Sequence, residues 1–257
     1  MAERVSLFGI KIDNLTRKEV FSEIEKIIKQ KKTSLIVTPN VQHINLIQKD
    51  KEFKKIYDEA SLVINDSKPL LWSSRILGSP IKERIPGSDL LPLFCEVAAK
   101  KKYKLFFLGA EPGIAKKAAE ILENKNPGLQ IVQTYSPPFG FEHNQQENHK
   151  IIEMINSCRP DVLFVGLGTP KGEKWSWIHR NELSVSVIIS VGAAFNFISQ
   201  NVKRAPSWMQ IMGLEWFHRL IQEPGRLWKR YLIGNSFFIW LTIREAISKK
   251  LLKKDSR

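Results

Sequence analysis

The stretch KLFFLGAEPGIAKKAAEILEN, residues 104–124, passes from a short apolar run through a glycine- and proline-containing turn into a helical pattern. After Gly113 the apolar residues recur at spacings of three and four, which is typical of the buried face of a helix. A strand followed at once by a helix is the first half of a βαβ unit, in which the next strand runs parallel to the first. This segment therefore predicts a parallel sheet.

The same alternation extends in both directions along the chain. Five further β-branched or aromatic runs predict buried strands, and helical patterns lie between them. We therefore expect an α/β fold, with a mostly parallel sheet and helices on both faces. The other expected strands are Ser34–Thr38, Leu62–Ile64, Leu129–Gln133, Asp161–Val165 and Ser186–Val191, and the other helices include Arg17–Gln30, Asn144–Ser157 and Lys171–Arg180.

Length and composition favour one globular domain, or one domain with an appendage. The chain has 257 residues, of which 43% are hydrophobic and 26% are charged, values close to those of globular proteins. Its two cysteines are too few for a disulfide framework. Neither a signal peptide nor a long apolar span is apparent, so we expect a soluble protein of the cytoplasmic side.

The positive charge is concentrated near the C-terminus. The net charge is +14, and residues 203–257 hold twelve Lys and Arg against four acids, together with four of the seven tryptophans. We therefore expect two parts: a sheet domain over residues 1–200 and a basic, Trp-rich helical appendage over 201–257 that flanks the sheet. Such charge favours an anionic partner: nucleic acid, a membrane surface or a phosphorylated substrate.

Glycine-containing turns follow three of the expected strands, after Leu108, Val165 and Val191. Turns of this kind at helix starts expose backbone N–H groups that suit phosphate oxygens. They match neither the dinucleotide fingerprint nor the P-loop pattern, and each can equally be an ordinary tight turn. The candidate donor-binding residues on them are Gly109, Ala110, Gly166, Gly168, Pro170, Lys171, Gly192 and Asn196.

Asp66, in the segment NDSKP, follows another expected strand. A carboxylate there can act as a general base, or it can merely cap the turn or the next helix. Thr38, Asn40 and Arg84 are open to similar alternatives, since turn residues and surface ion pairs are common. The aspartates are isolated, and no paired-histidine metal motif is present, so we expect no metal site.

Several blocks in order along the chain resemble one family. They are TPNVQHI (38–44), NDSKPLLW (65–72), ERIPGSDL (83–90), FFLGAEPG (106–113), VGLGTPKGEKW (165–175) and a long C-terminal run from Val191 to Leu232. Together they resemble the WecG/TagA/CpsF glycosyltransferases, glycosyltransferase family 26, over about residues 5–235.

The resemblance implies a Rossmann-like domain with a C-terminal helical appendage and an inverting, metal-independent hexosyltransferase without a cofactor. The implied donor is a UDP-sugar carrying a hexose or N-acetylhexosamine. The implied acceptor is an undecaprenyl-diphosphate-linked sugar at the inner face of the plasma membrane, in the synthesis of a cell-surface polysaccharide. The enzyme would then be cytoplasmic and peripheral on an anionic membrane, and a homo-oligomer is left open.

The resemblance also assigns roles to residues. It places the base at Asp66, and other active-site positions at Thr38, Asn40 and Arg84. Arg219 and Arg226 match appendage arginines expected to close over the site, with Lys229 nearby.

Three positions depart from the family pattern. Gly172 stands where the family has an active-site glutamine, Ser67 follows Asp66 where glycine is usual, and Asn196 replaces an aspartate. Loss of the glutamine removes hydrogen bonds to a sugar substituent, so a plain hexose donor becomes an alternative to an N-acetylated one.

Two other functions stay open on the residues alone. The basic, Trp-rich tail suits a nucleic-acid-binding module, and the glycine turns suit a dinucleotide enzyme. The specific C-terminal block argues against the first, and the missing fingerprint argues against the second.

Overall fold

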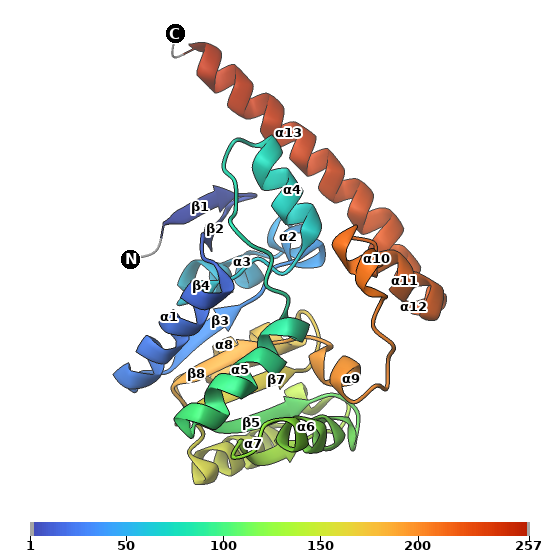
Figure 1. The fold of residues 1–257 in the computed structure, drawn as a ribbon. Coiled ribbons are helices and arrows are strands. Elements are labelled where there is room, and N and C mark those ends of the chain that lie inside the picture. Colours follow the sequence, from blue (N-terminus) through green and yellow to red (C-terminus); the bar gives the residue numbers. More distant parts are fainter. Residues whose placement is uncertain (1–2, 256–257) are drawn as a thin grey trace.

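The computed structural model describes residues 3–255, with side chains described as far as residue 251. Six parallel strands form the central sheet in the order β4-β3-β8-β7-β5-β6 (Figure 1). A separate antiparallel hairpin, β1 (Arg4–Leu7) and β2 (Ile10–Asp13), precedes them and was not predicted. The sheet strands are β3 (Ser34–Val37), β4 (Leu62–Val63), β5 (Lys104–Gly109), β6 (Gln130–Tyr135), β7 (Val162–Gly166) and β8 (Val187–Ser190).

Helices cover both faces of the sheet, as the alternating pattern predicts. The main helices are α1 (Arg17–Gln30), α2 (Val41–Ile47), α3 (Lys51–Glu59), α4 (Lys68–Ile76), α5 (Gly87–Lys101), α6 (Ile114–Lys125), α7 (Gln145–Cys158) and α8 (Lys171–His179), with a short 3₁₀ turn at Phe141–His143. The C-terminal segment adds α9 (Ala194–Ile198), α10 (Ser207–Ile211), α11 (Glu215–Gln222), α12 (Pro224–Trp228), the π-helix η2 (Lys229–Ile233) and α13 (Gly234–Asp255).

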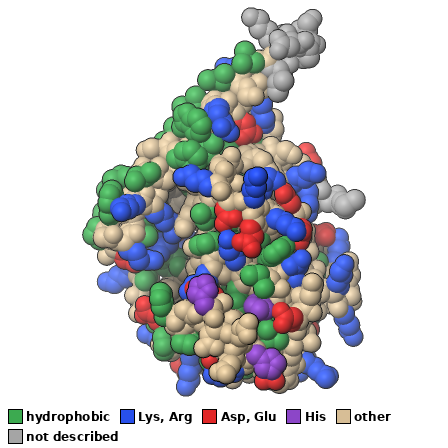
Figure 2. All heavy atoms as spheres, turned by 180° about the vertical axis from the view of Figure 1, so that it is seen from behind, with side chains coloured by type: hydrophobic (Ala, Val, Ile, Leu, Met, Phe, Trp, Pro, Cys, Tyr) green, Lys and Arg blue, Asp and Glu red, His purple; other side chains and the backbone are tan. Residues whose placement is uncertain are grey.

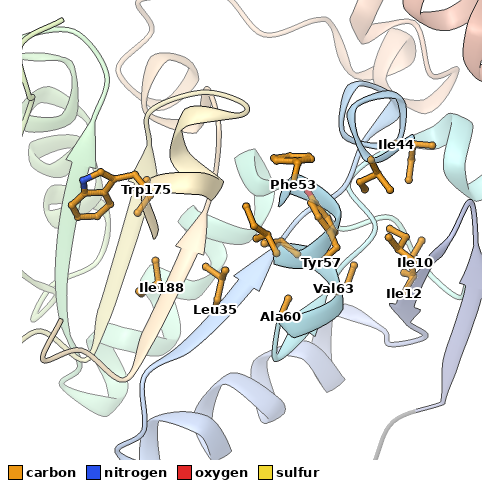
Figure 3. Close-up of a cluster of buried hydrophobic side chains, with 14 of the residues drawn as sticks. Ile10, Ile12, Leu35, Ile44, Phe53, Tyr57, Ala60, Val63, Trp175 and Ile188 are labelled. Atoms are coloured by element: carbon orange, nitrogen blue, oxygen red, sulfur yellow. The ribbon is translucent and has the colours of Figure 1, made fainter. Parts of the chain in front are cut away.

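Two buried clusters lie on the two faces of the sheet. One face packs against α3, α7 and α8 through residues such as Phe53, Tyr57 and Trp175 (Figure 3). The other packs against α1, α5 and α6 through residues such as Ile24 and Phe94. Strands buried on both faces are expected to be nearly continuous in apolar residues, and β7 is buried at every position.

The order of the strands creates a switch point between β5 and β7. The chain leaves β5 through α6 toward β6, whereas it leaves β7 through α8 in the opposite direction toward β8. The two helices accordingly lie on opposite faces, since Ala118 and Leu122 of α6 belong to one cluster and Trp175 of α8 to the other. Ligands of open α/β sheets bind at the carboxyl ends of strands at such a point.

The sequence predicts that the C-terminal segment flanks the sheet. In the structure, the segment packs mainly on helices and on the N-terminal hairpin and not directly on the sheet. Helix α13 packs on α2 and α4 and on the N-terminal hairpin, and α10 to α12 lie beyond α4 (Figure 1). Asn45 Nδ2 donates to the Gly234 carbonyl at 2.8 Å, and Phe238 and Leu241 are buried in the first cluster. The division at residue 200 stays a prediction, but α13 shares the core of the preceding residues.

Candidate functional site

Asp66 lies at the carboxyl end of the edge strand β4, in a turn that does not need it as a cap. Ser67 is the N-cap of α4 and accepts a hydrogen bond from the Leu70 N–H. The Asp66 backbone is held by its neighbours, because its N–H donates to the Pro39 carbonyl and its carbonyl accepts from Arg84 Nε at 2.9 Å. The Asp66 carboxylate therefore does not cap the helix and is available to contact a substrate.

The surroundings of Asp66 suit a general base. Burial raises the pKa of its carboxyl group, the positive charge of Arg84 and a hydrogen bond from Asn40 oppose that rise, and the negative charge of Glu215 adds to it. A carboxyl group with a raised pKa accepts a proton more readily than an ordinary aspartate does.

Asn40 has two roles in the structure. Its side-chain oxygen caps α2 by accepting from the N–H groups of Gln42 and His43. Its Nδ2 therefore faces the other way and donates to Asp66 Oδ2 at 3.4 Å. Thr38, by contrast, is buried and its hydroxyl donates to the Ser190 carbonyl at 3.1 Å, between β3 and β8. The structure thus places Asn40 in contact with Asp66, whereas the Thr38 hydroxyl is used in a hydrogen bond between two strands of the sheet.

A buried polar network that we did not predict lies behind Asn40. The Asn40 N–H donates to His43 Nδ1 at 3.1 Å, so Nδ1 is an acceptor and Nε2 is left for the other partners. Nε2 lies 2.8 Å from the Thr169 hydroxyl and 3.2 Å from Glu173 Oε1. His43 and Glu173 are both almost completely buried. Their positions in the sequence, 130 residues apart, gave no sign of this pairing.

Arg84 belongs to a network of ion pairs with Glu215, Arg204 and Asp89, which we call the clasp, and is therefore already paired with a carboxylate. Its guanidinium group pairs with Glu215 of α11, which also binds Arg204 Nε at 3.3 Å. Arg204 in turn pairs with Asp89 of α5. Since Arg84 and Asp89 precede the sheet's third strand and Arg204 and Glu215 belong to the appendage, the clasp closes the appendage over the Asp66 side of the sheet.

Arg219, Arg226 and Arg230 of the appendage lie close to one another, and the pKa of Arg230 also responds to the charge of Asp66. Burial lowers the pKa of Arg230, the neighbouring Arg219 and Arg226 lower it further, and Asp66 is close enough to oppose this decrease. Arg219 is largely buried, lies with its guanidinium carbon 5.4 Å from the Phe197 ring centre, and is 3.9 Å from Glu223. Arg226 is more exposed and donates to Glu223 through Nε at 2.6 Å.

Arg230 is thus a further basic residue of this group, which the sequence analysis did not name, and the placement of Lys229 near the site stays a prediction. No carboxylate of the described residues pairs with Arg230. Helical periodicity gave no signal for this grouping, because the helix break at Pro224 separates Arg219 from Arg226 and Arg230 lies in a π-helix.

The expected donor-binding residues line the rim of β5, β7 and β8, where some glycines are explained by packing. A Cβ on Gly109 would lie 2.6 Å from the backbone of Gly166, and a Cβ on Gly166 would lie 2.5 Å from the Phe195 ring. The Ala110 N–H is already used by the Gly166 carbonyl. Gly168 and Gly192 have positive φ and open space beside them.

The remaining rim residues have partners of their own. Pro170 begins α8 and, as a proline, offers no N–H. Lys171 pairs with Glu142 at 2.7 Å, and Asn196 accepts a hydrogen bond from Asn201 Nδ2. A Cβ at Gly172 would make ordinary contacts with Val165 and Leu167, so this position has room for a side chain.

The described residues contain no cluster of three or more His, Cys, Asp or Glu side chains able to hold a metal ion. Arg84 supplies positive charge near Asp66, and Arg230 of the appendage responds to the charge of Asp66.

Comparison with known proteins agrees with this geometry. The chain is 33% identical over 230 residues to an N-acetylglucosaminyldiphosphoundecaprenol N-acetyl-beta-D-mannosaminyltransferase of Bacillus subtilis (strain 168), covering 90% of this chain and 87% of that protein. It is 26% identical over 253 residues to a protein of the same name from Staphylococcus aureus (strain MW2), covering 98% and 95% of the two chains. Residues 5–251 match the family described as Glycosyl transferase WecG/TagA/CpsF family, and the chain is a glycosyltransferase belonging to that family.

Proposed function

We propose that the protein transfers a sugar from a UDP donor to the sugar of an undecaprenyl-diphosphate-linked acceptor. The acceptor is inferred from the names of the two relatives, which describe transfer to N-acetylglucosaminyldiphosphoundecaprenol. The observation that carries the proposal is Asp66: a carboxylate at a strand end, not used as a cap, with a raised pKa and arginines opposite.

In the proposed reaction the Asp66 carboxylate takes the proton of the acceptor hydroxyl as that oxygen attacks the anomeric carbon. The bond between this carbon and the UDP oxygen breaks on the opposite face, so the anomeric configuration inverts. The departing diphosphate gains negative charge, which Arg219, Arg226 and Arg230 are placed to neutralise. Asn40 orients the carboxylate through its Nδ2 group.

The switch point between β5 and β7 supports placing the nucleotide of the donor there, beside Gly168 and Gly192. Strands are spaced about 4.8 Å apart, so this point lies about three and a half strand spacings, or roughly 17 Å, from β4 and Asp66. A UDP-sugar lying along the rim can bridge that interval. The names of the relatives favour an N-acetylmannosamine donor, whereas Gly172 favours a donor without the N-acetyl group.

The appendage supports docking on the cytoplasmic face of an anionic membrane. Of the seventeen large apolar side chains exposed among the described residues, thirteen lie between Trp208 and Leu251. Figure 2 shows hydrophobic side chains gathered along the C-terminal helix, with Lys and Arg side chains close to them. Apolar and basic groups together favour the headgroup region of a membrane. No described helix is both long and apolar enough to cross a membrane.

The proposal is tested by transfer assays on the full chain, with several UDP-sugars offered against a lipid-diphosphate-linked N-acetylglucosamine. Asp66→Asn should lower kcat by about 10² to 10⁴, the usual contribution of a positioned base, while UDP binding is kept. Asp58→Asn is the matched control, since Asp58 is exposed on α3 and Lys54 is its one ion-pair partner among the residues whose side chains are described. Near wild-type turnover of Asp66→Asn would remove Asp66 from the role of base.

A further inference from the structure

A cavity of about 420 Å³ lies between α4, the segment before α5 and α10 of the appendage. Four cationic side chains line it, Arg17, Lys68, Lys82 and Arg84, and the apolar part of its wall includes Leu71 and Ile211. Two carboxylates also line it, and both are paired: Glu83 with Arg17, and Asp89 with Arg204. The function proposed above places no substrate in this cavity.

Three of the four cations are already paired. Arg17 binds Glu83 at 3.2 Å, Lys82 binds Glu19 at 3.2 Å, and Arg84 belongs to the clasp with Glu215. Lys68 has no carboxylate within ion-pair distance among the described residues. The cavity therefore holds one ammonium group that is available for an anion.

Lys68 places the cavity next to the candidate active site at Asp66. Lys68 is the first residue of α4 and follows Asp66 by two residues. Arg84, which also lines the cavity, donates to the Asp66 carbonyl. An anion bound here is therefore close to the base, and it lies at the β4 edge of the sheet, away from the switch point between β5 and β7.

Exposed apolar side chains lie on the elements that form the cavity. Leu71 and Ile211 are part of its wall, and the exposed side chains of Trp72, Ile76 and Met212 lie on the same two elements or next to them. The two sides approach closely, because a Cβ on Gly213 would lie 2.6 Å from the Trp72 ring. The charged residues of the wall all precede the appendage, and the docking of the appendage on α4 adds Ser207, Gln210 and the apolar Ile211.

We propose that this cavity binds the diphosphate and the first isoprene units of the acceptor, with Lys68 contacting the diphosphate. The inference rests on the proposed function and specifies its acceptor subsite. In such an acceptor one sugar ring separates the diphosphate from the attacked hydroxyl, which matches a cation close to Asp66 but not in contact with it. The prenyl chain leaves over Leu71 and Ile211 toward the exposed apolar side chains of the appendage.

The test uses the full chain and two soluble probes, farnesyl-diphosphate-linked N-acetylglucosamine as acceptor and farnesyl diphosphate as a binding ligand. Lys68→Gln should raise the KM for the acceptor and the Kd for farnesyl diphosphate by about tenfold to a hundredfold, the usual effect of losing a hydrogen bond to a charged group. The KM for the donor should not change. Lys29→Gln, which removes the same charge from an exposed position near the end of α1, should alter neither constant.

A second variant examines the apolar part. Ile211→Gln, at a site that is 72% exposed, should weaken binding of farnesyl diphosphate but not of methyl diphosphate. Vesicles of phosphatidylglycerol form a further arm, and displacement of farnesyl diphosphate by them would identify a phospholipid site and overturn the proposal. An unchanged acceptor KM in Lys68→Gln, or a raised donor KM, would also overturn it. Because calorimetric binding needs no turnover, absence of transfer with every donor would refute the proposed function separately.

Discussion

Replacement of Phe238 by alanine is expected to destabilise the whole protein, although Phe238 lies in the C-terminal appendage. Its side chain is only 4% exposed, and its ring centre is 5.1 Å from that of Phe8 in the N-terminal hairpin. Next to it on α13, Thr242 and Ser73 of α4 share a hydrogen bond at 3.1 Å. Helix α13 is thus held by packing against the core of the preceding residues.

The magnitude follows from the area that the ring removes from water. A buried aromatic side chain covers about 150–250 Å², and at about 25 cal/mol per Å² this amounts to about 4–6 kcal/mol. Alanine keeps part of that contact, so the expected loss in the free energy of unfolding is about 3–5 kcal/mol. This is a large share of the roughly 5–15 kcal/mol that stabilises a typical domain.

Urea unfolding followed by circular dichroism measures this loss. The matched control is Ile239→Ala on the same helix, where the side chain is 59% exposed and the expected change is within about 0.5 kcal/mol. Ile239→Ala and Trp240→Ala should instead weaken binding to anionic vesicles. If Phe238→Ala lowers the free energy of unfolding by less than about 1 kcal/mol, α13 does not share the core and the appendage is separable.

Three other predictions concern the site. Because burial and Glu215 raise the pKa of Asp66 above the ordinary 3.8, and because the base acts only when deprotonated, kcat should fall as the pH drops through this raised pKa. Glu215→Gln removes a negative charge that raises the pKa of Asp66, and it also releases Arg84 from its ion pair. The acid limb of the pH–rate profile should therefore move to lower pH, and a move to higher pH would contradict the assignment of Asp66 as the base. Transfer should proceed at a comparable rate in excess EDTA, and its abolition with recovery on added Mg²⁺ or Mn²⁺ would show that a metal is required. His43→Ala leaves the buried Glu173 without its imidazole partner and should reduce the free energy of unfolding by about 1–3 kcal/mol in urea titrations, whereas an unchanged midpoint would mean that the pair contributes nothing to stability.

The sequence by itself determined which segments form strands and helices, and approximately where each begins and ends. All six sheet strands were predicted to within about two residues, and α1 has the expected bounds Arg17–Gln30. The break between α11 and α12 lies at Pro224, which as a proline lacks the N–H that would continue the preceding helix. These features are local, because a period of two or 3.6 residues and a proline without an N–H act within a few residues of the chain. The placement of Asp66 at a strand end follows from the same patterns.

Only the tertiary structure decided which side chains meet. The order β4-β3-β8-β7-β5-β6, and with it the switch point, depends on pairing between distant segments. The clasp of Arg84 with Glu215 and the pair of His43 with Glu173 join residues 131 and 130 positions apart, a distance over which no periodicity applies. The N-terminal hairpin was missed for a similar reason, since its strands have four residues each and are stabilised by packing on the rest of the core.

The adjacent basic residues Lys229 and Arg230 show most clearly what the sequence pattern leaves undetermined, which is the direction in which each side chain points. The two basic residues are adjacent, and on a regular helix they point about 100° apart. The segment Lys229–Ile233 is a π-helix, whose wider turn changes the direction of each side chain relative to the α-helix before it. Composition therefore determined that a basic group lies in this part of the appendage, whereas the tertiary structure determined that the pKa of Arg230 responds to the charge of Asp66.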